Sequence, residues 1–563
     1  MPDETTTGAR FIAETFKGYG VSHVFFVDAI LRMTMVELED VGVRRVITHS
    51  EKAAAYMADG YARVSHRPGV CMAQSVGAAN LAAGLQDAYL GRSPVVALTG
   101  KKPPLFQERN AYQEIEHGPL FEAVTKYCAD VVTPAQLPFL LRQAFREVTT
   151  GTPRPAHLDL LGHSGRPLEA AEGLGPVVVE AAYSRIPAVR PAPEARAIER
   201  AAEAIAAAER PVLVAGGGVR LSRAQQELVA LAEKLSIPVA TSVNGKGSIL
   251  DNHPLSVGVV GSYSVRSANQ VVSEADLVIY VGSNTGDQVT YNWQVPPIGT
   301  PVVQIDINPA EIGRSYPGAV PVVADARKAL VALRDAVQAR ENDAWVKRAQ
   351  SLVQAWRDDV EAQRRSDEVP IRPERLCREL GEVLPEDAVL VADTGYSAIW
   401  TATMVPLTHP GQTYLRAAGS LGWSFPAALG AKCAAPDRPV ICFNGDGAFW
   451  YHFGELETAR RHNINTVTII NNNGGLGQGI KDIHGVYGDH PGNPEELYRF
   501  EPVNFARIAE EMGCFGVRVE DPHEIAPAIR QALEADAPAV VEVISGLHHR
   551  AQEPWAPGAD ARQ

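Results

Sequence analysis

The chain lacks the features that mark a disulfide-stapled, zinc-binding or membrane-spanning protein. Only six of its 563 residues are cysteines, and no two of them form a CxxC pair, so neither a disulfide framework nor a zinc site is indicated. No apolar run approaches the roughly 20 residues that a membrane-spanning helix needs. The opening MPDETTTGARFIAETF lacks the basic-then-apolar order of a signal peptide. We therefore expect a soluble cytoplasmic protein with no membrane partner.

An excess of positive charge is also missing. Lys and Arg number 52 against 66 Asp and Glu, which gives a net charge of −14. A surface of this sign disfavours nucleic acid and anionic membranes as general partners. It still allows an anionic small molecule, which needs only a local basic patch.

What the chain does contain is a repeated alternation of short apolar strands and amphipathic helices. Runs such as VSHVFFV, PVLVAGGGV and PVICFNGDG are separated by helical segments, which is typical of parallel sheets covered by helices. The fold class predicted is α/β, with three open parallel-sheet domains that carry helices on both faces. The predicted domains are 1–185, 190–345 and 365–545, followed by a Pro- and Gly-rich tail, 546–563, that is either disordered or an active-site lid.

A carboxylate and an amide mark the ends of two neighbouring predicted strands in the third domain. PVICFN runs into Gly445-Asp446-Gly447, and NTVTIIN runs into Asn472-Asn473. Ligands bind at the carboxyl ends of parallel strands, and the helix start after Asp446 suits a phosphate. Asp and Asn oxygens are hard ligands of the kind that Mg²⁺ prefers. The pair therefore predicts a magnesium site that holds a diphosphate.

The whole segment GDGAFWYHFGELETARRHNINTVTIINNNGG resembles the cofactor motif of the thiamine-diphosphate-dependent enzyme family. The resemblance implies thiamine diphosphate and Mg²⁺ as cofactors, with Asp446, Asn473 and the backbone carbonyl of Gly475 as metal ligands. It also places three small residues beside the cofactor, namely Gly445, Gly447 and Ala448. Asn471 creates an ambiguity of register, and we take Asn472-Asn473 as the family pair because two glycines follow directly.

Glu51 is the candidate acid at the other end of the cofactor. It follows a predicted strand and opens an apolar-faced helix, so it is either an ordinary helix-start glutamate or a proton-sharing acid. HSEKAAAYMADGYAR is similar to the family segment HExxAxxMAxGYAR. The resemblance implies that Glu51 is the catalytic glutamate, which polarises the pyrimidine so that a carbanion forms at the thiazolium carbon.

Other segments extend the resemblance over nearly all of residues 5–545. In LRAAGSLGWSFPAALGAKCA, Leu421 takes the place of the apolar wedge that bends the cofactor. VADTGYSAIW matches a diphosphate-contacting loop, which makes Tyr396 and Ser397 candidate donors. In NAYQEIEHGPLFEAVTKY, Tyr112 and Gln113 fall where relatives contact the substrate, although Tyr112 is equally consistent with a buried loop tyrosine.

The resemblance also bears on assembly and on the central domain. Glu51 and Asp446 lie in different domains yet would serve one cofactor, which occurs across a subunit interface in the family, so we expect a homodimer or homotetramer. The central segments AGGGVR and QIDINPAEIG are consistent with a bound nucleotide. ADP is implied by CoA-using relatives and FAD by acetolactate synthases, and a vestigial domain that binds neither is the other alternative.

The reaction is less defined than the cofactor. The pattern looks most like the 2-hydroxyacyl-CoA lyases, so the first prediction is cleavage of an acyl-CoA, 2-hydroxyisobutyryl-CoA, to formyl-CoA and a ketone or aldehyde. GDHPGNPEELYRF, with Glu495, Glu496 and Arg499, and the tail with His548, His549 and Arg550 favour that branch. The alternatives are an acetolactate-synthase-like enzyme or 2-oxo acid decarboxylase, an oxalyl-CoA decarboxylase, and a non-catalytic nucleotide-binding protein.

Overall fold

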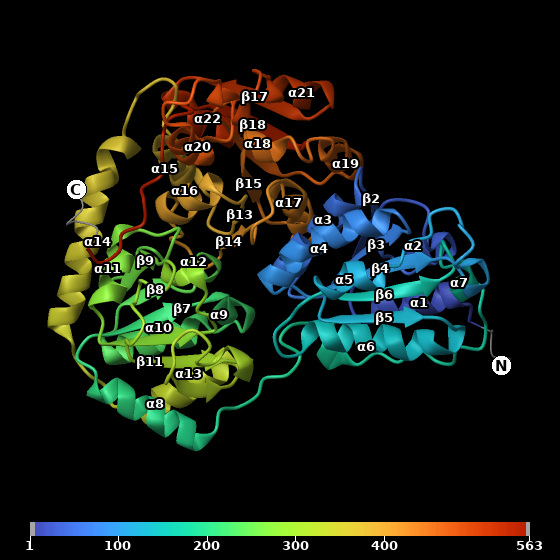
Figure 1. Ribbon diagram of the computed structural model, residues 1–563, viewed down its shortest axis with the longest axis horizontal. Coiled ribbons are helices and arrows are strands. Elements are labelled where there is room, and N and C mark those ends of the chain that lie inside the picture. The colour runs from blue at the N-terminus through green and yellow to red at the C-terminus, as the bar shows by residue number, and fades with distance from the viewer. Residues whose placement is uncertain (1–5, 559–563) are drawn as a thin grey trace.

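The computed structural model describes residues 6–558 and consists of three six-stranded sheets, each with all of its strands parallel. Figure 1 shows the three sheets as separate lobes, each covered by helices. Successive strand residues enter different cores: Val24 and Phe25 do so in the first sheet, and Ile441 and Cys442 in the third. Both faces of these sheets are therefore buried, which explains why their strands read as continuous apolar runs. The predicted fold class is confirmed.

The first sheet has the strand order β2-β1-β3-β4-β6-β5. Its strands are β1 (His23–Phe26), β2 (Arg44–Ile47), β3 (Gly69–Gln74), β4 (Val95–Lys101), β5 (Tyr127–Val131) and β6 (Ala156–Leu161). The helices around it are α1 (Gly8–Gly18), α2 (Arg32–Asp40), α3 (Glu51–Ser65), α4 (Gly77–Gly91), α5 (Gly118–Glu122), α6 (Leu137–Thr149) and α7 (Arg166–Glu169).

The central sheet has the order β12-β11-β10-β7-β8-β9. Its strands are β7 (Pro211–Ala215), β8 (Val239–Thr241), β9 (Ser256–Val259), β10 (Leu277–Val281), β11 (Val302–Asp306) and β12 (Val320–Val323). Its helices are α8 (Ala195–Ala207), α9 (Gly217–Leu221), α10 (Gln225–Leu235), α11 (Arg266–Glu274), α12 (Asp287–Thr290) and α13 (Ala326–Ala336). The long helix α14 (Asp343–Arg364) then leads to the third sheet along one edge of the molecule (Figure 1).

The third sheet has the order β14-β13-β15-β16-β18-β17. Its strands are β13 (Val389–Ala392), β14 (Thr413–Arg416), β15 (Val440–Gly445), β16 (Val467–Asn472), β17 (Phe515–Val519) and β18 (Ala539–Ile544). Its helices are α15 (Pro373–Val383), α16 (Tyr396–Met404), α17 (Ser424–Ala434), α18 (Asp446–Phe449), α19 (Glu455–His462), α20 (Ile480–Tyr487), α21 (Phe505–Glu511) and α22 (Ile525–Glu534). The first and third sheets share one strand-order pattern, so the two outer domains are built alike.

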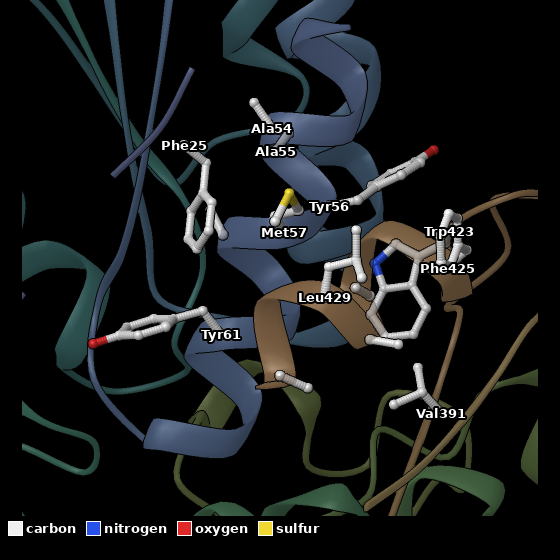
Figure 2. Close-up of a cluster of buried hydrophobic side chains, with 14 of the residues drawn as sticks. Phe25, Ala54, Ala55, Tyr56, Met57, Tyr61, Val391, Trp423, Phe425 and Leu429 are labelled. Carbon is white, nitrogen blue, oxygen red and sulfur yellow. The ribbon is translucent and has the colours of Figure 1, made fainter. Parts of the chain in front are cut away.

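Helices α3 and α17 join the two outer domains through one continuous core. Figure 2 shows Tyr56 and Met57 of α3 beside Trp423 and Leu429 at α17, and these side chains are fully buried. The backbones approach so closely that a Cβ added to Gly430 would lie 1.9 Å from the carbonyl oxygen of Met57. Only glycine fits at this crossing.

The replacement Gly430→Ala tests this close crossing. We expect it to lower the free energy of unfolding by about 1–3 kcal/mol, because the added methyl group forces two packed backbones apart. Urea unfolding of the variant and of wild type measures the difference. Gly454→Ala is the matched control, since a Cβ there meets no atom within 4 Å, and an equal loss in both variants would contradict the explanation.

The described part of the tail is ordered along the central domain. The Trp356 indole N–H of α14 donates to Gln552 Oε1 at 3.1 Å, and Asn269 Nδ2 of α11 donates to the Trp555 carbonyl at 2.8 Å. Figure 1 shows the tail descending from the third domain beside α14. The last five residues of the predicted lid, 559–563, lie outside the described residues. No helix within residues 6–558 has the length and apolar character needed to cross a membrane.

Candidate active site

The fold brings Asp446, Asn473 and Gly475 together at one edge of the third sheet. β15 and β16 are adjacent, and Gly445 pairs with Asn471, so both strands end at the same level. The Asp446 carboxylate faces the backbone N–H groups of Asn473 and Gly475. Asn473 Oδ1 accepts a hydrogen bond from the Gly475 N–H at 3.2 Å. The three predicted metal ligands therefore converge on one point.

The Asp446 carboxylate is buried in an environment that favours binding of a cation. Its side chain is buried, and burial raises the pKa of the carboxyl to about 6, although nearby backbone N–H groups act in the opposite direction. A buried anion without a counter-charge is costly, and a divalent ion would keep it ionised. Within residues 6–558, no group of three or more His, Cys, Asp or Glu side chains could hold a metal. A set with one carboxylate, one amide and one carbonyl suits Mg²⁺, which takes few protein ligands.

The three consecutive asparagines have different environments. Asn471 and Asn472 are buried within β16, and Asn472 Nδ2 donates to the buried carboxylate of Glu542 at 2.7 Å. Asn473 lies beyond the strand end and is half-buried. Asn473 thus lies beyond the strand end beside Asp446, and its role as a metal ligand stays a prediction.

Ser397 and Gly447, which are also expected at the diphosphate end, lie around this point. A Cβ added to Gly445 would lie 3.6 Å from Ser397 Oγ, so Ser397 adjoins the Asp446 turn. Tyr396 is half-buried against Trp400, with ring centroids 4.8 Å apart. The packing at Gly447 is tight, because an added Cβ would lie 2.7 Å from Leu476.

Leu421 reaches the same region from the loop before α17. Its neighbour Gly422 has φ +87°, and an added Cβ would lie 3.1 Å from the Ala448 carbonyl and 2.6 Å from the Tyr451 Cβ. Only glycine satisfies both the conformation and the contact. The loop that carries Leu421 is thus pressed against α18, which begins at Asp446.

Glu51 forms a second cluster on the first domain. It opens α3 behind Ser50, whose hydroxyl accepts the Ala53 N–H at 3.1 Å. Its carboxylate faces α4, where Asn80 Nδ2 donates to Oε2 at 3.1 Å and Gly77 leaves room for Oε1. An added Cβ at position 77 would lie 2.3 Å from Oε1, so the Glu51 side chain would have to shift.

Gln113 belongs to the Glu51 side of the molecule. Its backbone carbonyl accepts a hydrogen bond from the Ser75 hydroxyl, in the loop that leads to Gly77. Its side-chain Nε2 donates to the hydroxyl of Tyr112 at 3.2 Å, and Oε1 is buried without a partner among the described residues. Tyr112 itself is 77% exposed, so it is not a buried loop tyrosine in the single chain.

A separate cavity of about 380 Å³ lies where the three domains meet. It is lined by the loop of Gly216–Gly218 and by four arginines, namely Arg63, Arg92, Arg220 and Arg416. Among the acids that line it, Asp325 is engaged with Arg190 at 3.0 Å and Ser222 at 2.7 Å. Within residues 6–558, Asp306 forms no ion pair with a cationic side chain, and burial raises its pKa to about 6. Arginine side chains and a glycine loop are chemical features that can bind a phosphate group.

The residues of the third domain fit thiamine diphosphate and Mg²⁺ by the chemistry of their donors. They supply a buried carboxyl, an amide oxygen and a tight glycine turn, and the neighbouring Asn444 and Asn471 hold buried polar atoms without partners in the described part of the chain.

Comparison with known proteins places the chain in a family. Residues 6–120, 198–333 and 393–543 match three descriptions: "Thiamine pyrophosphate enzyme, N-terminal TPP binding domain", "central domain" and "C-terminal TPP binding domain". The chain belongs to the thiamine pyrophosphate enzyme family.

Several relatives carry one name. The probable acetolactate synthase large subunit of Methanocaldococcus jannaschii is 33% identical over 556 residues, covering 95% of this chain and 91% of the relative. The acetolactate synthase large subunit of Corynebacterium glutamicum is 32% identical, with 96% and 87% covered. The acetolactate synthase isozyme 1 large subunit of Escherichia coli is 28% identical, with 98% and 96% covered.

These relatives correct the prediction of an acyl-CoA substrate. The main prediction, cleavage of 2-hydroxyacyl-CoA to formyl-CoA, is wrong, because the similar chains are named acetolactate synthases and align over almost their whole length. The predictions of a lyase and of coenzyme A as a substrate group are wrong for the same reason. The two features that favoured it are engaged within the chain. Arg499 pairs with Glu495 at 2.7 Å, and Gln552 and Trp555 of the tail bind the central domain and α14.

Proposed function

We propose that this chain catalyses a thiamine-diphosphate-dependent reaction of 2-oxo acids, as an acetolactate synthase does. In that reaction two molecules of pyruvate give acetolactate and carbon dioxide. The proposal is carried by one observation, the similarity to acetolactate synthase large subunits across 95% of this chain. Bound thiamine diphosphate supplies an electron sink for the carbon–carbon bond that breaks next to a carbonyl.

Within this proposal each cluster has a distinct role. Asp446, Asn473 and the Gly475 carbonyl hold Mg²⁺ and through it the diphosphate, beside Gly445, Gly447, Ala448, Tyr396 and Ser397. Glu51 shares a proton with the pyrimidine ring, and Leu421 bends the cofactor. Gln113 and Tyr112 face the substrate, where an amide N–H or a hydroxyl stabilises a developing negative charge.

The decisive experiment is an assay with a panel of substrates. The purified chain is incubated with thiamine diphosphate, Mg²⁺ and pyruvate or a longer 2-oxo acid, and carbon dioxide and the condensed acid are identified by mass. Formation of acetolactate supports the proposal. Release of carbon dioxide with an aldehyde instead would indicate a 2-oxo acid decarboxylase, and turnover of thioesters but no 2-oxo acid would overturn the proposal.

The central cavity bears on the same proposal. Its arginines and glycine loop suit a nucleotide diphosphate, and FAD is the nucleotide that an acetolactate-synthase-like chain implies. No comparison supports ADP. We expect the purified protein to carry flavin absorbance that is lost on denaturation and filtration, and release of ADP alone would contradict this expectation.

A shared site between two chains would explain why the Glu51 and Asp446 clusters lie on different domains. In the described part of one chain, no hydrogen bond or ion pair links the Glu51 carboxylate with Asp446, Asn473 or Gly475. A homodimer or homotetramer with sites at the interface, in the cytoplasm, is therefore our prediction.

Complementation tests the shared site. Glu51→Gln and Asp446→Ala chains with different tags are co-expressed, and the mixed dimers are isolated. If each site takes Glu51 from one chain and Asp446 from the other, one of the two sites is intact, and about half of the wild-type activity returns. Each variant alone is the control. Inactive mixed dimers would place both residues of a site in the same chain.

A further inference from the structure

The loop between β14 and α17, which carries Leu421, is bound by a carboxylate from a different domain. Asp87 of α4 accepts the backbone N–H of Ala418 on Oδ1 at 2.9 Å. Its other oxygen accepts the N–H groups of Gly419 at 3.2 Å and Ser420 at 3.0 Å. Three successive backbone donors directly before Leu421 thus converge on one fully buried side chain.

A second buried carboxylate binds the other side of the loop. Asp393, at the end of β13, accepts the Gly422 N–H at 3.0 Å and the Ser424 N–H at 2.8 Å. Leu421 therefore lies between three N–H groups that point to Asp87 and two that point to Asp393. The indole of Trp423 is held in turn by Asp59 of α3, at 2.9 Å.

Asp87 also forms an ion pair with a buried arginine. Arg63 Nη2 lies 3.0 Å from Asp87 Oδ1 and also binds Asp59 at 2.6 Å, with its guanidinium over the Trp423 ring at 4.5 Å. Hydrogen bonds to an ionised acceptor are about twice as strong as neutral ones. An amide in place of Asp87 would keep one acceptor oxygen and turn an NH₂ group toward the loop donors. The geometry thus uses both oxygens of a carboxylate.

From these contacts we infer that Asp87 is a positioning residue for Leu421. It acts through the loop backbone and fixes how far the Leu421 side chain extends beside α18. The inference rests on the proposed thiamine chemistry, in which Leu421 supports the bent cofactor. A residue that only stabilised the interface between the domains would form the same hydrogen bonds. The test must therefore distinguish positioning of Leu421 from stabilisation of the α3–α17 interface.

Amide hydrogen exchange without cofactor tests the loop itself. In Asp87→Asn we expect the peptide over 418–424 to exchange about tenfold faster, while peptides of α3 and α17 keep their wild-type rates. Ser93→Ala is the matched control, because Ser93 accepts a bond from Arg63 Nε at 3.0 Å and has no hydrogen bond to the loop. Unchanged exchange at 418–424 in Asp87→Asn would overturn the inference.

A double-mutant cycle with Leu421→Ala tests the connection to the cofactor. The readout is the rate at which the thiazolium proton of bound thiamine diphosphate exchanges with deuterium, which needs no substrate. A shift of about 1 Å can cost 100-fold in rate, so we expect Asp87→Asn to slow exchange about 10- to 100-fold in wild type and less than about threefold in Leu421→Ala. Equal effects in both backgrounds would overturn the inference.

The outcomes distinguish this inference from the proposed function. A wild-type protein that exchanges the thiazolium proton but consumes no 2-oxo acid would refute the function and leave the inference standing. If Asp87→Asn does not fold, Asp393→Asn releases the same loop from its other side. It should then show the same exchange at 418–424 and the same dependence on Leu421, and a wild-type profile in that variant would overturn the inference.

Discussion

Glu51→Gln is expected to lower kcat for a 2-oxo acid by about 10²- to 10⁴-fold, the range that a positioned general acid–base contributes. The amide keeps the size of the side chain and can still accept from Asn80, which holds the wild-type carboxylate at 3.1 Å. It has no ionisable proton to share with the pyrimidine. Binding of thiamine diphosphate and the free energy of unfolding should therefore change little, while turnover is nearly lost.

A matched control for Glu51→Gln is Glu457→Gln. Glu457 contacts the loop that precedes Glu51, where it accepts a hydrogen bond from His49 Nε2 at 2.8 Å. Its side chain is a partly exposed partner in an ion pair. Such pairs contribute about 0–1 kcal/mol, so the control should retain activity within about fivefold. Steady-state kinetics at saturating cofactor measure both variants, and a Glu51→Gln enzyme within tenfold of wild type would remove Glu51 from the mechanism.

The cofactor end of the site could be read from the sequence because its geometry is local. Asp446 and Asn473 each follow an apolar strand, and parallel strands that are neighbours in a sheet end at one edge, as the pairing of Gly445 with Asn471 confirms. In the sequence the two glycines that follow favour Asn472-Asn473, and the structure adds the environment of each asparagine. The side chain of Asn472 is used by Glu542, which lies 70 residues further along the chain.

Contacts between segments that are distant in the chain leave no recognisable pattern in the sequence. Asp87 reads as one polar residue in the helix LAAGLQDAYLG, and its loop partners begin 331 positions later. Asp393 follows an apolar run in the sequence, but its bonds to Gly422 and Ser424 follow only from the position of α17. The Pro- and Gly-rich composition of the tail predicts disorder or a lid, because composition does not reveal the side chains of α14 and α11 that bind it.

The sequence predicts the wrong substrate for a chemical reason. Enzymes of this family share the residues that activate the cofactor, and these residues dominate the recognisable motifs. Tyr112, which is predicted to face the substrate, lies in a loop and is 77% exposed in one chain. An isolated loop has no periodicity or strand end to constrain its interpretation, so the cofactor was predictable where the reaction was not.

Asp446→Asn is expected to weaken Mg²⁺-dependent binding of thiamine diphosphate at least about 100-fold, because the only carboxylate among the predicted ligands is lost and Mg²⁺ affinity depends strongly on ligand charge. The pH dependence follows from the same group. Burial raises the pKa of Asp446 to about 6 in the metal-free protein. A metal must displace that proton, so affinity should be level above about pH 7 and fall up to tenfold per pH unit below 6.

The stability of the metal-free protein should respond in the opposite direction. The folded pKa, about 6, exceeds the ordinary value of 3.8, so the buried anion destabilises the fold above pH 6, and this cost disappears as the pH falls toward 3.8. Loss of affinity in acid would therefore not reflect unfolding caused by Asp446.

Calorimetric titrations from pH 5 to 8 measure the affinity. The diphosphate also titrates, and the Asp446→Asn profile, taken at higher cofactor concentration, isolates that contribution. Asp306→Asn is the control, since burial raises that pKa to about 6 as well but in the central domain. If wild type and Asp446→Asn show the same slope, or differ less than tenfold in affinity at pH 7.5, Asp446 does not hold the metal.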